Sequence, residues 1–243
     1  MNAFDRPLIE AMSHYAVHSQ SVAHIVDAIS KMYLFKGTLL VALLWWIWFR
    51  HYRATSPDDI AIRRRDRELV VIAIVSGFLA FLAGRLLAHY LPFRLRPVYE
   101  PALQGLYPVT KVDQLLPRTW SAFPSDHAML WCAISMGIFL ASRWLGIYAF
   151  IHTAVLIGLP RVYLGLHYPS DVIVGGLLGI LLAGVMSVRP VRALAAKPVL
   201  AMARRWPGPF FALAFLLSFE LATQFDEFRV IAHFFSEHYF EMS

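Results

Sequence analysis

Residues 161–171 read Arg-Val-Tyr-Leu-Gly-Leu-His-Tyr-Pro-Ser-Asp, and they separate two long apolar segments of the chain. They place a cation, an imidazole and a carboxylate close together, as Arg161, His167 and Asp171. On a helical turn the spacing of His167 and Asp171 brings both side chains to one face, so the carboxylate can hold one ring nitrogen. A histidine held in this way is a usual nucleophile or general base, and Arg161 adds a charged fork suited to phosphate or carboxylate. Taken alone, the stretch is also compatible with a solvated loop between two helices.

The composition is that of a membrane protein. Of the 243 residues, 58% are hydrophobic, and several windows approach the roughly 20 apolar residues that span a bilayer. We therefore predict an all-α integral membrane bundle of about six transmembrane helices, at about 32–49, 69–91, 127–142, 144–160, 172–188 and 208–225. The fifth span carries Gly175, Gly179 and Ala183 at four-residue spacing, a surface that lets another helix approach closely.

Residues 1–31 differ from the rest of the chain. They mix apolar and polar positions as N-terminal amphipathic helices do, and we expect them to lie on the membrane rather than cross it. No Ser-, Gly- or Pro-rich linker divides residues 32–243, which are predicted to form one domain. An N-terminal secretory signal is not expected, because Asp5 and Glu10 come early and the first long apolar run begins near Met32.

Lys and Arg are distributed unequally between the loops. The connectors at 50–68, 143 and 189–206 share one face of the predicted bundle, and they hold more than twice as many of these residues as the connectors 92–125 and 161–171 on the other face. By the positive-inside rule the first face is cytoplasmic, so both termini and residues 161–171 are predicted to lie outside. The net charge of +6 is thus interpreted as a topology signal, and no nucleic-acid partner is expected.

Further polar residues gather at the outer ends of the predicted spans. Ser125, Asp126 and His127 open the third span after a proline. Ser125 or Asp126 is predicted to cap this helix, and the free backbone N–H groups of a helix start form a natural anion site. His127 then lies in the first turn, beside any bound anion.

The second span ends with Arg85 and His89, four residues apart on one helix face. An ionisable group at that depth is costly, so we expect a functional role, with snorkelling of Arg85 to the interface as the alternative. Arg94 and Arg96 follow directly and add two cations at the mouth of the expected site.

Three motifs, in this order and on one predicted membrane face, resemble those of the type 2 phosphatidic acid phosphatase superfamily. Family members carry Lys-x6-Arg-Pro, Pro-Ser-Gly-His and Ser-Arg-x5-His-x3-Asp. The corresponding residues here are Arg96-Pro97, Pro124-Ser125-Asp126-His127 and Arg161-x5-His167-x3-Asp171. The resemblance covers residues 85–188 directly, and the six-helix layout extends it over most of the chain. It implies that residues 32–243 form a six-helix transmembrane phosphatase domain.

The resemblance also implies roles for the catalytic residues. His167 would attack phosphorus and form a phosphohistidine, while Asp171 would fix its tautomer and stabilise the developing imidazolium. His127 would protonate the leaving oxygen and later activate the water that releases phosphate.

Binding of the phosphate is implied for a second set of residues. Arg96 and Arg161 would clamp the nonbridging oxygens, and Ser125 with the helix start would add hydrogen-bond donors. No metal and no other cofactor is expected, because the arginines take the place of a cation.

The chain departs from the family pattern at three positions. His89 stands where the first motif has lysine, so this phosphate contact is neutral, altered, or replaced by Arg85 or Arg94. Pro160 stands where serine is usual in the third motif. Asp126 replaces the glycine of the second motif, and its carboxylate would either repel anions or bind and orient a histidine or an arginine.

Phe-Pro-Ser-Asp-His at 123–127, together with the altered first motif, is most similar to the bacterial undecaprenyl-diphosphate phosphatase branch. This implies removal of the terminal phosphate of undecaprenyl diphosphate at the outer face of the bacterial inner membrane, which recycles the lipid carrier of peptidoglycan synthesis. The expected partners are the lipid substrate and the bilayer, and the oligomeric state is left open.

Other functions use the same residues and stay as alternatives. The substrate could be phosphatidylglycerophosphate, phosphatidic acid or lipid A, or the phosphate could pass to another lipid. A non-catalytic scaffold or a transporter with a phosphatase-like shell is a further alternative from a different class. The intact His127, Arg161, His167 and Asp171 argue against it.

Overall fold

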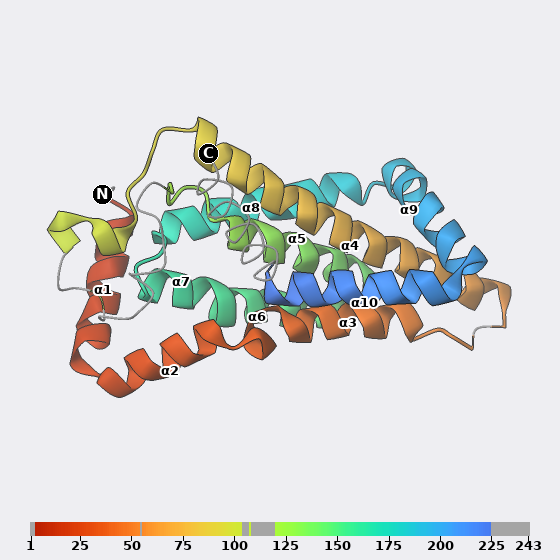
Figure 1. Cartoon of the computed structure of the whole chain (residues 1–243), viewed down its shortest axis with the longest axis horizontal. Coiled ribbons are helices and arrows are strands. Elements are labelled where there is room, and N and C mark those ends of the chain that lie inside the picture. Colours follow the sequence, from red (N-terminus) through yellow and green to blue (C-terminus); the bar gives the residue numbers. More distant parts are fainter. Residues whose placement is uncertain (1–2, 54, 104–106, 108–119, 225–243) are drawn as a thin grey trace, which may run out of the picture.

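The computed structural model describes residues 3–53, 55–103, 107 and 120–224. Across these residues the regular secondary structure is helical, and no strand is present among them (Figure 1). The helices are α1 (Asp5–His18), α2 (Gln20–Lys31), η1 (Leu34–Thr38), α3 (Leu39–Phe49), α4 (Pro57–Tyr90), η2 (Pro97–Tyr99), η3 (Pro101–Leu103), α5 (Asp126–Ala141), α6 (Arg143–His152), η5 (Thr153–Gly158), α7 (Leu159–Tyr163), α8 (Pro169–Met186), α9 (Arg189–Arg205) and α10 (Pro207–Thr223).

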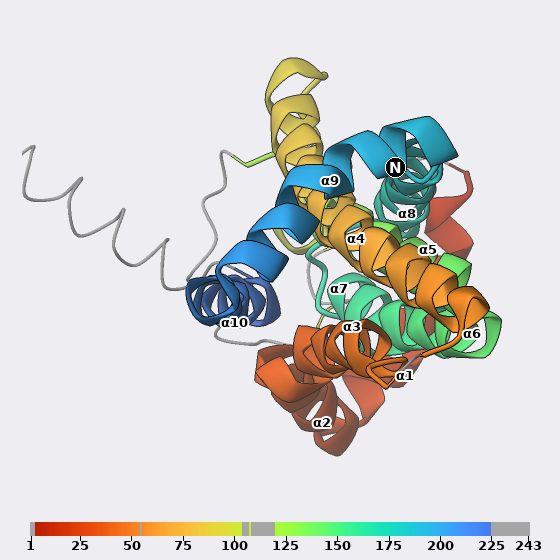
Figure 2. The ribbon, with the colours of Figure 1, turned by 90° about the vertical axis from the view of Figure 1, so that its right-hand side faces the viewer.

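The longest described helix is α4, which contacts α3, α5, α8 and α9 (Figure 2). It begins after Ser56, whose Oγ accepts a hydrogen bond from the Asp59 N–H at 3.1 Å, and Pro57 occupies the first helical position. Its 34 residues give a length of about 51 Å, more than the roughly 30 Å of a bilayer core. The arginine-rich turns at 63–67 therefore project beyond the apolar layer.

Small residues allow α8 to pack directly on α5. At Gly175 an added Cβ would lie 2.6 Å from the carbonyl oxygen of Ser125, and at Gly179 it would lie 2.2 Å from that of Met129. Ala183, on the same face, is fully buried. The predicted close-approach surface is thus confirmed, and it brings the first turns of α5 and α8 together.

Within the described residues, three helical stretches are long and apolar enough to cross a membrane: α4, the continuous stretch Arg143–Tyr163, and α8. The stretch Leu34–Phe49 meets the same criterion only together with α2, from which it is bent by 65°. The apolar helices α5 and α10 are shorter, at 16 and 17 residues. Each of the six predicted spans coincides with an apolar helical segment, and the protein is an all-α integral membrane bundle.

The helices α1 and α2 lie across one end of the bundle (Figure 1). Ser19 separates them and caps α2, because its Oγ accepts a hydrogen bond from the Val22 N–H at 3.3 Å. Both helices contact other parts of the protein: α1 packs on α7 and α8, and α2 packs on α7 and η1. The prediction that residues 1–31 are helical is confirmed for the described part, and their position outside the spans, on the membrane surface, stays a prediction.

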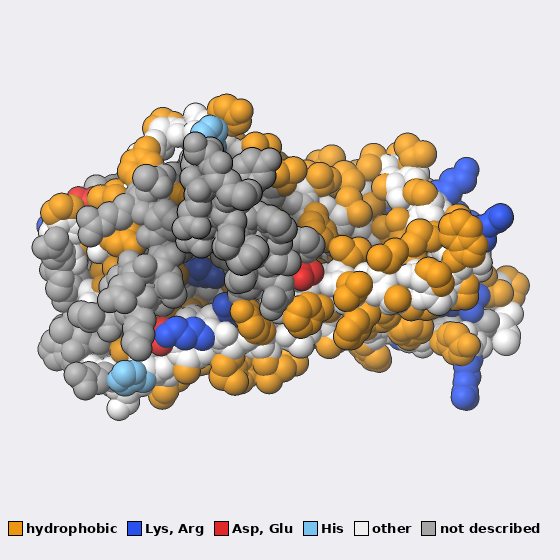
Figure 3. Space-filling model, viewed as in Figure 1, with side chains coloured by type: hydrophobic (Ala, Val, Ile, Leu, Met, Phe, Trp, Pro, Cys, Tyr) orange, Lys and Arg blue, Asp and Glu red, His pale blue; other side chains and the backbone are white. Residues whose placement is uncertain are grey.

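The charged side chains are polarised along the molecule. Lys and Arg side chains project from the end at which α4 begins and α9 lies, away from α1 and α2 (Figures 1 and 3). This basic end carries the connectors 50–68 and 189–206, which the positive-inside rule predicts to be cytoplasmic. The orientation in the membrane itself stays a prediction.

Candidate active site

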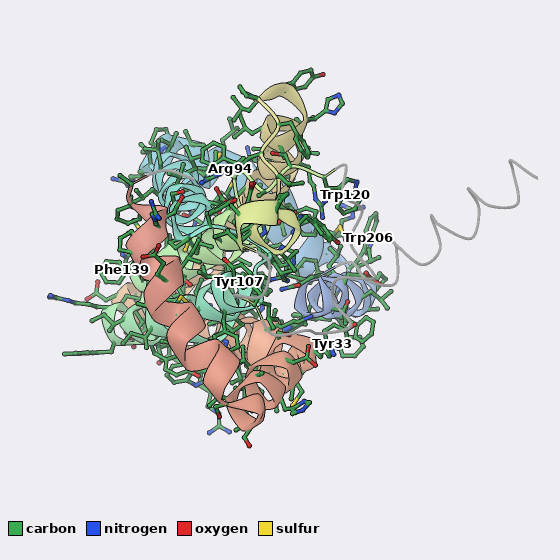
Figure 4. The ribbon with its side chains drawn as sticks, turned by 90° about the vertical axis from the view of Figure 1, so that its left-hand side faces the viewer. Tyr33, Arg94, Tyr107, Trp120, Phe139 and Trp206 are labelled. Carbon is green, nitrogen blue, oxygen red and sulfur yellow. The ribbon has the colours of Figure 1, made fainter. Side chains whose placement is uncertain are left out.

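At the end of the bundle away from these basic connectors lies a cavity of about 280 Å³. It is lined by side chains of α4 and α5 and of the loops before α5 and α8, namely Gly84, Arg85, Ala88, His89, Arg96, Trp120, Ser121, Pro124, Asp126 and His167. Figure 4 looks onto this end of the molecule and labels Arg94, Tyr107 and Trp120 there. The fold thus gathers residues of all three motifs around one cavity.

His167 lies in a tight turn between α7 and α8. Gly165 has a left-handed φ of 67°, which glycine adopts without steric cost and which lets the chain reverse. The backbone N–H groups of Leu166 and His167 donate to the Arg161 carbonyl at 2.9 and 3.2 Å. On the other side of the turn, the Val98 N–H donates to the Gly165 carbonyl at 3.0 Å. The loop is therefore held on both sides, and His167 is only 3% exposed.

The nearest partner of the His167 ring is a carbonyl group. Nδ1 lies 2.7 Å from the carbonyl oxygen of Ala122, whereas Oδ2 of Asp171 is 4.0 Å away. The prediction that Asp171 holds the ring on a shared helical turn is wrong, because α8 begins at Pro169 and His167 precedes it. A carbonyl oxygen only accepts hydrogen bonds, so Nδ1 carries the proton and Nε2 keeps its lone pair.

The protonation state of His167 follows from its surroundings. Burial, and next the positive charge of Arg96, lower the pKa of His167 from 6.5 to about 3. The imidazole is therefore neutral at physiological pH. A neutral ring whose Nδ1–H is held by a carbonyl presents Nε2 as a nucleophile.

Asp126 joins a histidine to an arginine. Its Oδ1 lies 2.7 Å from Nδ1 of His127, and its Oδ2 lies 2.8 Å from Nε of Arg85. Of the two alternatives that the sequence left open, the structure has the one in which the carboxylate orients both groups. The guanidinium of Arg85 also lies 4.6 Å from the Trp120 ring centroid, so this side chain is held at the cavity and does not snorkel.

The sequence predicted Ser125 or Asp126 as the N-cap of α5, and the structure has Ser125 in that position. Its Oγ accepts a hydrogen bond from the Ala128 N–H at 3.5 Å, and its own N–H donates to the Asp171 carbonyl at 3.1 Å. The side chain is fully buried and is not part of the cavity lining. Ser125 thus locks the start of α5 to α8, and its contact with phosphate stays a prediction.

Arg96 lines the cavity and carries a buried hydrogen-bond donor that no described residue satisfies. Its side chain is buried, its Nη1 donates to the Leu166 carbonyl at 3.2 Å, and its Nε is buried without a hydrogen-bond partner among the described residues. Burial lowers the pKa of Arg96, but a guanidinium remains protonated in proteins. A buried cation with an unsatisfied donor favours an anion beside it.

Arg161 lies on α7, and its Nη2 donates to Oε1 of Gln224 at 3.5 Å. Its positive charge acts on both His127 and His167, although its side chain is not part of the cavity lining. The predicted pair of histidines and the third-motif arginine are therefore close enough to interact electrostatically.

The two remaining predicted residues differ in their positions. His89 is exposed on α4 and lines the cavity, where the family motif has lysine. Arg94 is ion-paired with Asp5, with Nη2 2.6 Å from Oδ2, and also with Asp171. Both carboxylates hold Arg94, which is not part of the cavity lining, and its contact with phosphate stays a prediction.

Three groups of the site were not singled out from the sequence: Asp5, Trp120 and the Ala122 carbonyl. Asp5 is one acid in an amphipathic segment, and a backbone carbonyl leaves no mark in a sequence. Trp120 could have been considered from the sequence, because it is an aromatic residue shortly before the second motif and aromatic rings bind arginine side chains. Among the described residues, no cluster of three or more His, Cys, Asp or Glu could hold a metal ion.

Fold and site together define an integral membrane protein in which the buried His127 and His167 lie at the end of the bundle that holds the cavity lined by Arg85 and Arg96. The chain belongs to the PAP2 superfamily, whose family model matches residues 67–193. This confirms the family that the three motifs resemble.

Curated relatives match about half of the chain. The chain is 29% identical over 123 residues to the bacitracin transport permease protein BcrC of Bacillus licheniformis, and 31% identical over 121 residues to an undecaprenyl-diphosphatase of Sulfolobus acidocaldarius. Each match covers 49% of this chain and 54% of the relative, so the chain spans about half the length of these relatives. A PAP2-type phosphatidylglycerolphosphate phosphatase from Bacillus subtilis, known from its crystal structure, is 21% identical with a TM-score of 0.46, over 81% of this chain and 88% of the other.

Proposed function

We propose that the protein is a metal-independent lipid phosphatase that removes the terminal phosphate of undecaprenyl diphosphate through a phosphohistidine. The observation that carries this proposal is one cavity lined by both a neutral His167, held at Nδ1, and Arg96, whose buried Nε has no hydrogen-bond partner among the described residues. A nucleophile and an anion site side by side are what phosphoryl transfer needs.

The first chemical step forms the covalent intermediate. Nε2 of His167 attacks the terminal phosphorus, and the bond from that phosphorus to the bridging oxygen breaks. His127, as imidazolium, gives a proton to the leaving oxygen, and undecaprenyl phosphate departs. The Asp126 carboxylate, whose Oδ1 lies 2.7 Å from Nδ1 of His127, orients the ring for this transfer.

The second step restores the enzyme. His127, now neutral, takes a proton from water as the water attacks the phosphohistidine, and inorganic phosphate leaves. Charge on the transferring phosphoryl group is balanced by the guanidinium groups of Arg96 and Arg161, with Arg85 at the cavity wall. Because these cations are fixed, the chemistry proceeds without a metal ion.

The choice of undecaprenyl diphosphate rests on the similarity to an undecaprenyl-diphosphatase and on the altered first motif. A location in the bacterial inner membrane with the cavity on the periplasmic side is supported by the basic end of the molecule, which lies away from the cavity (Figure 3). There the lipid diphosphate that remains after sugar transfer would meet the arginines.

Phosphate release by the purified protein in EDTA tests this function. The lipids to compare are undecaprenyl diphosphate, phosphatidylglycerophosphate, phosphatidic acid and lipid A, with His167→Ala and, as a matched control, the exposed His24→Ala. We expect the protein to release phosphate preferentially from undecaprenyl diphosphate. His167→Ala should abolish this release, and His24→Ala should retain it. Preference for another lipid would replace the substrate, and no release from any lipid would favour the scaffold alternative.

A further inference from the structure

The first helix brings a buried carboxylate to the catalytic end of the bundle. Asp5, the first residue of α1, is completely buried. Its Oδ1 accepts a hydrogen bond from the Ser170 N–H at 2.8 Å, and its Oδ2 accepts one from Ser170 Oγ at 2.7 Å and one from Arg94 Nη2 at 2.6 Å. Removing a carboxylate from water costs free energy, and a buried carboxylate is therefore stable only where hydrogen bonds and a cation such as these compensate that cost.

From Asp5, one route of contacts leads to the ring of the nucleophile. Arg94 binds Asp5 through its guanidinium, and its carbonyl accepts a hydrogen bond from the Ala122 N–H at 2.8 Å. The carbonyl of the same Ala122 lies 2.7 Å from Nδ1 of His167. The position of the His167 ring therefore depends on the backbone segment around Arg94, which the ion pair with Asp5 fixes.

A second route leads to the backbone beside the nucleophile. Arg94 also pairs with Asp171, whose Oδ2 accepts a hydrogen bond from the Tyr168 N–H at 2.8 Å. Asp5 itself holds Ser170, in the first turn of α8. Both contacts anchor the residues that directly follow His167.

Apolar contacts extend this attachment along the N-terminal helices. Ile9 of α1 is 1% exposed and packs with Ala122 and Tyr168, the two residues through which the polar routes run. The loop before His167 is covered in the same way. Its residues Tyr163, Leu164 and Leu166 pack against Met12, Ala23 and Val26 of α1 and α2.

We propose that Asp5 is a positioning residue for phosphoryl transfer, and that α1 and α2 brace the loop that carries His167. This inference rests on the proposed function, because it assigns Asp5 an effect on the attack by His167. An attacking nitrogen displaced by about 1 Å can cost about 100-fold in rate, so a brace on both sides of His167 acts on kcat. Asp5 does not touch the substrate in this scheme, and KM is expected to change little.

The substitution Asp5→Asn tests the brace. It keeps the shape but removes the charge and sets an NH2 group against the donors of Arg94 or Ser170. We expect kcat to fall about 10- to 100-fold, with KM within about twofold of wild type, when activity is expressed per folded, monodisperse protein. The matched control is Glu10→Gln, on the same helix in the exposed Arg6–Glu10 ion pair, which should retain wild-type kcat. An unchanged kcat in Asp5→Asn, or a loss that only follows the folded fraction, would overturn the proposal.

A double-mutant cycle tests whether Asp5 acts through Arg94. Because both residues belong to one contact, the kcat losses of Asp5→Asn and Arg94→Gln should fall well short of multiplying in the double variant. Losses that multiply fully would mean that Asp5 acts by another route, and the proposed path to Ala122 and His167 would be wrong.

A measurement independent of turnover separates this inference from the proposed function. In ¹⁵N-histidine-labelled protein, the His167 resonances, assigned with His167→Gln, report the tautomer and the hydrogen bond at Nδ1. Asp5→Asn should shift them, and Glu10→Gln should not. Unshifted resonances with an active wild type would refute the brace alone. A shift in a protein that releases no phosphate from any lipid would refute the proposed function and leave only the structural link.

Discussion

The carboxylate of Asp126 is shared between two groups that the sequence motifs treat separately. On one oxygen it holds Nδ1 of His127, and on the other it holds Nε of Arg85. The arginine compensates the negative charge that replaces the usual glycine, so the carboxylate can support His127 without leaving an unpaired anion at the phosphate site. In the proposed function, Arg85 thereby makes an acidic second motif compatible with an anionic substrate.

Replacing Arg85 should therefore be costly. We expect Arg85→Ala to lower kcat/KM by about 10- to 100-fold, the loss typical of a charged hydrogen bond of about 1.5–3 kcal/mol. The control is Arg65→Ala, an exposed arginine whose Nη2 donates to the Leu140 carbonyl at the basic end. Steady-state kinetics of both variants give the comparison, and equally small effects would contradict the role given to Arg85.

The low pKa of His167 has a consequence for stability. Its pKa is about 3 in the folded protein and 6.5 in the unfolded chain, so between these values the unfolded state binds the extra proton. The free energy of unfolding should then fall as the pH drops from 6.5 towards 3, by up to about 1.4 kcal/mol per pH unit from this one group. Thermal unfolding in detergent should lose less stability over this range in His167→Gln than in wild type. Identical pH profiles would show that His167 titrates normally.

Residues that stand at motif spacings can be recognised from the sequence, whereas residues whose partners are distant in the chain cannot. His127, Arg161 and His167 stand at motif spacings, and the fold brings them within electrostatic range. The partner of the His167 ring was assigned wrongly, because a four-residue spacing suggests a helical turn, and Pro169 starts the helix only after the histidine. Asp5 was not foreseeable, since its partners lie about 90 and 165 residues further along the chain.

The contact between α5 and α8 sets the distance between the second and third motifs. It depends on glycine at two positions where backbone lies directly opposite. Gly179→Val should push α8 away from Met129 and destabilise the protein by about 1–3 kcal/mol, as overpacking does. Gly184→Ala is the matched control on the same helix, because an added Cβ there meets nothing within 4 Å. Melting temperatures in detergent distinguish the two, and an equal change in both would contradict the close packing.

Apolar length was enough to locate the helices of the bundle but not their irregularities. The fourth predicted span is one continuous stretch from Arg143 to Tyr163 with a π-helical middle, η5, and the first span begins with the π-helical turn η1. Hydrophobicity indicates burial in lipid or protein, but it does not distinguish an α-helical turn from a π-helical turn. For the same reason hydrophobicity gave no sign that α1 and α2 would pack on the loop that carries His167.

The molecule as a whole separates a basic end from the end that holds the cavity (Figure 3). If the basic end is cytoplasmic, a membrane-impermeant thiol reagent applied to intact cells should label Tyr90→Cys, at a position that is 79% exposed near the cavity. It should label Arg204→Cys at the basic end only after the cells are permeabilised. Both variants are made with Cys132→Ala, which removes the single native cysteine. The reverse labelling pattern would contradict the proposed orientation.

The phosphohistidine is tested most directly by trapping it. Protein mixed with undecaprenyl diphosphate labelled on its terminal phosphate is quenched within the first turnover, and the labelled peptide is identified. We expect an acid-labile label on the 161–171 segment at His167, absent from His167→Ala and retained in His24→Ala. Turnover by His167→Ala near the wild-type rate, or a label on another residue, would show that His167 is not the nucleophile.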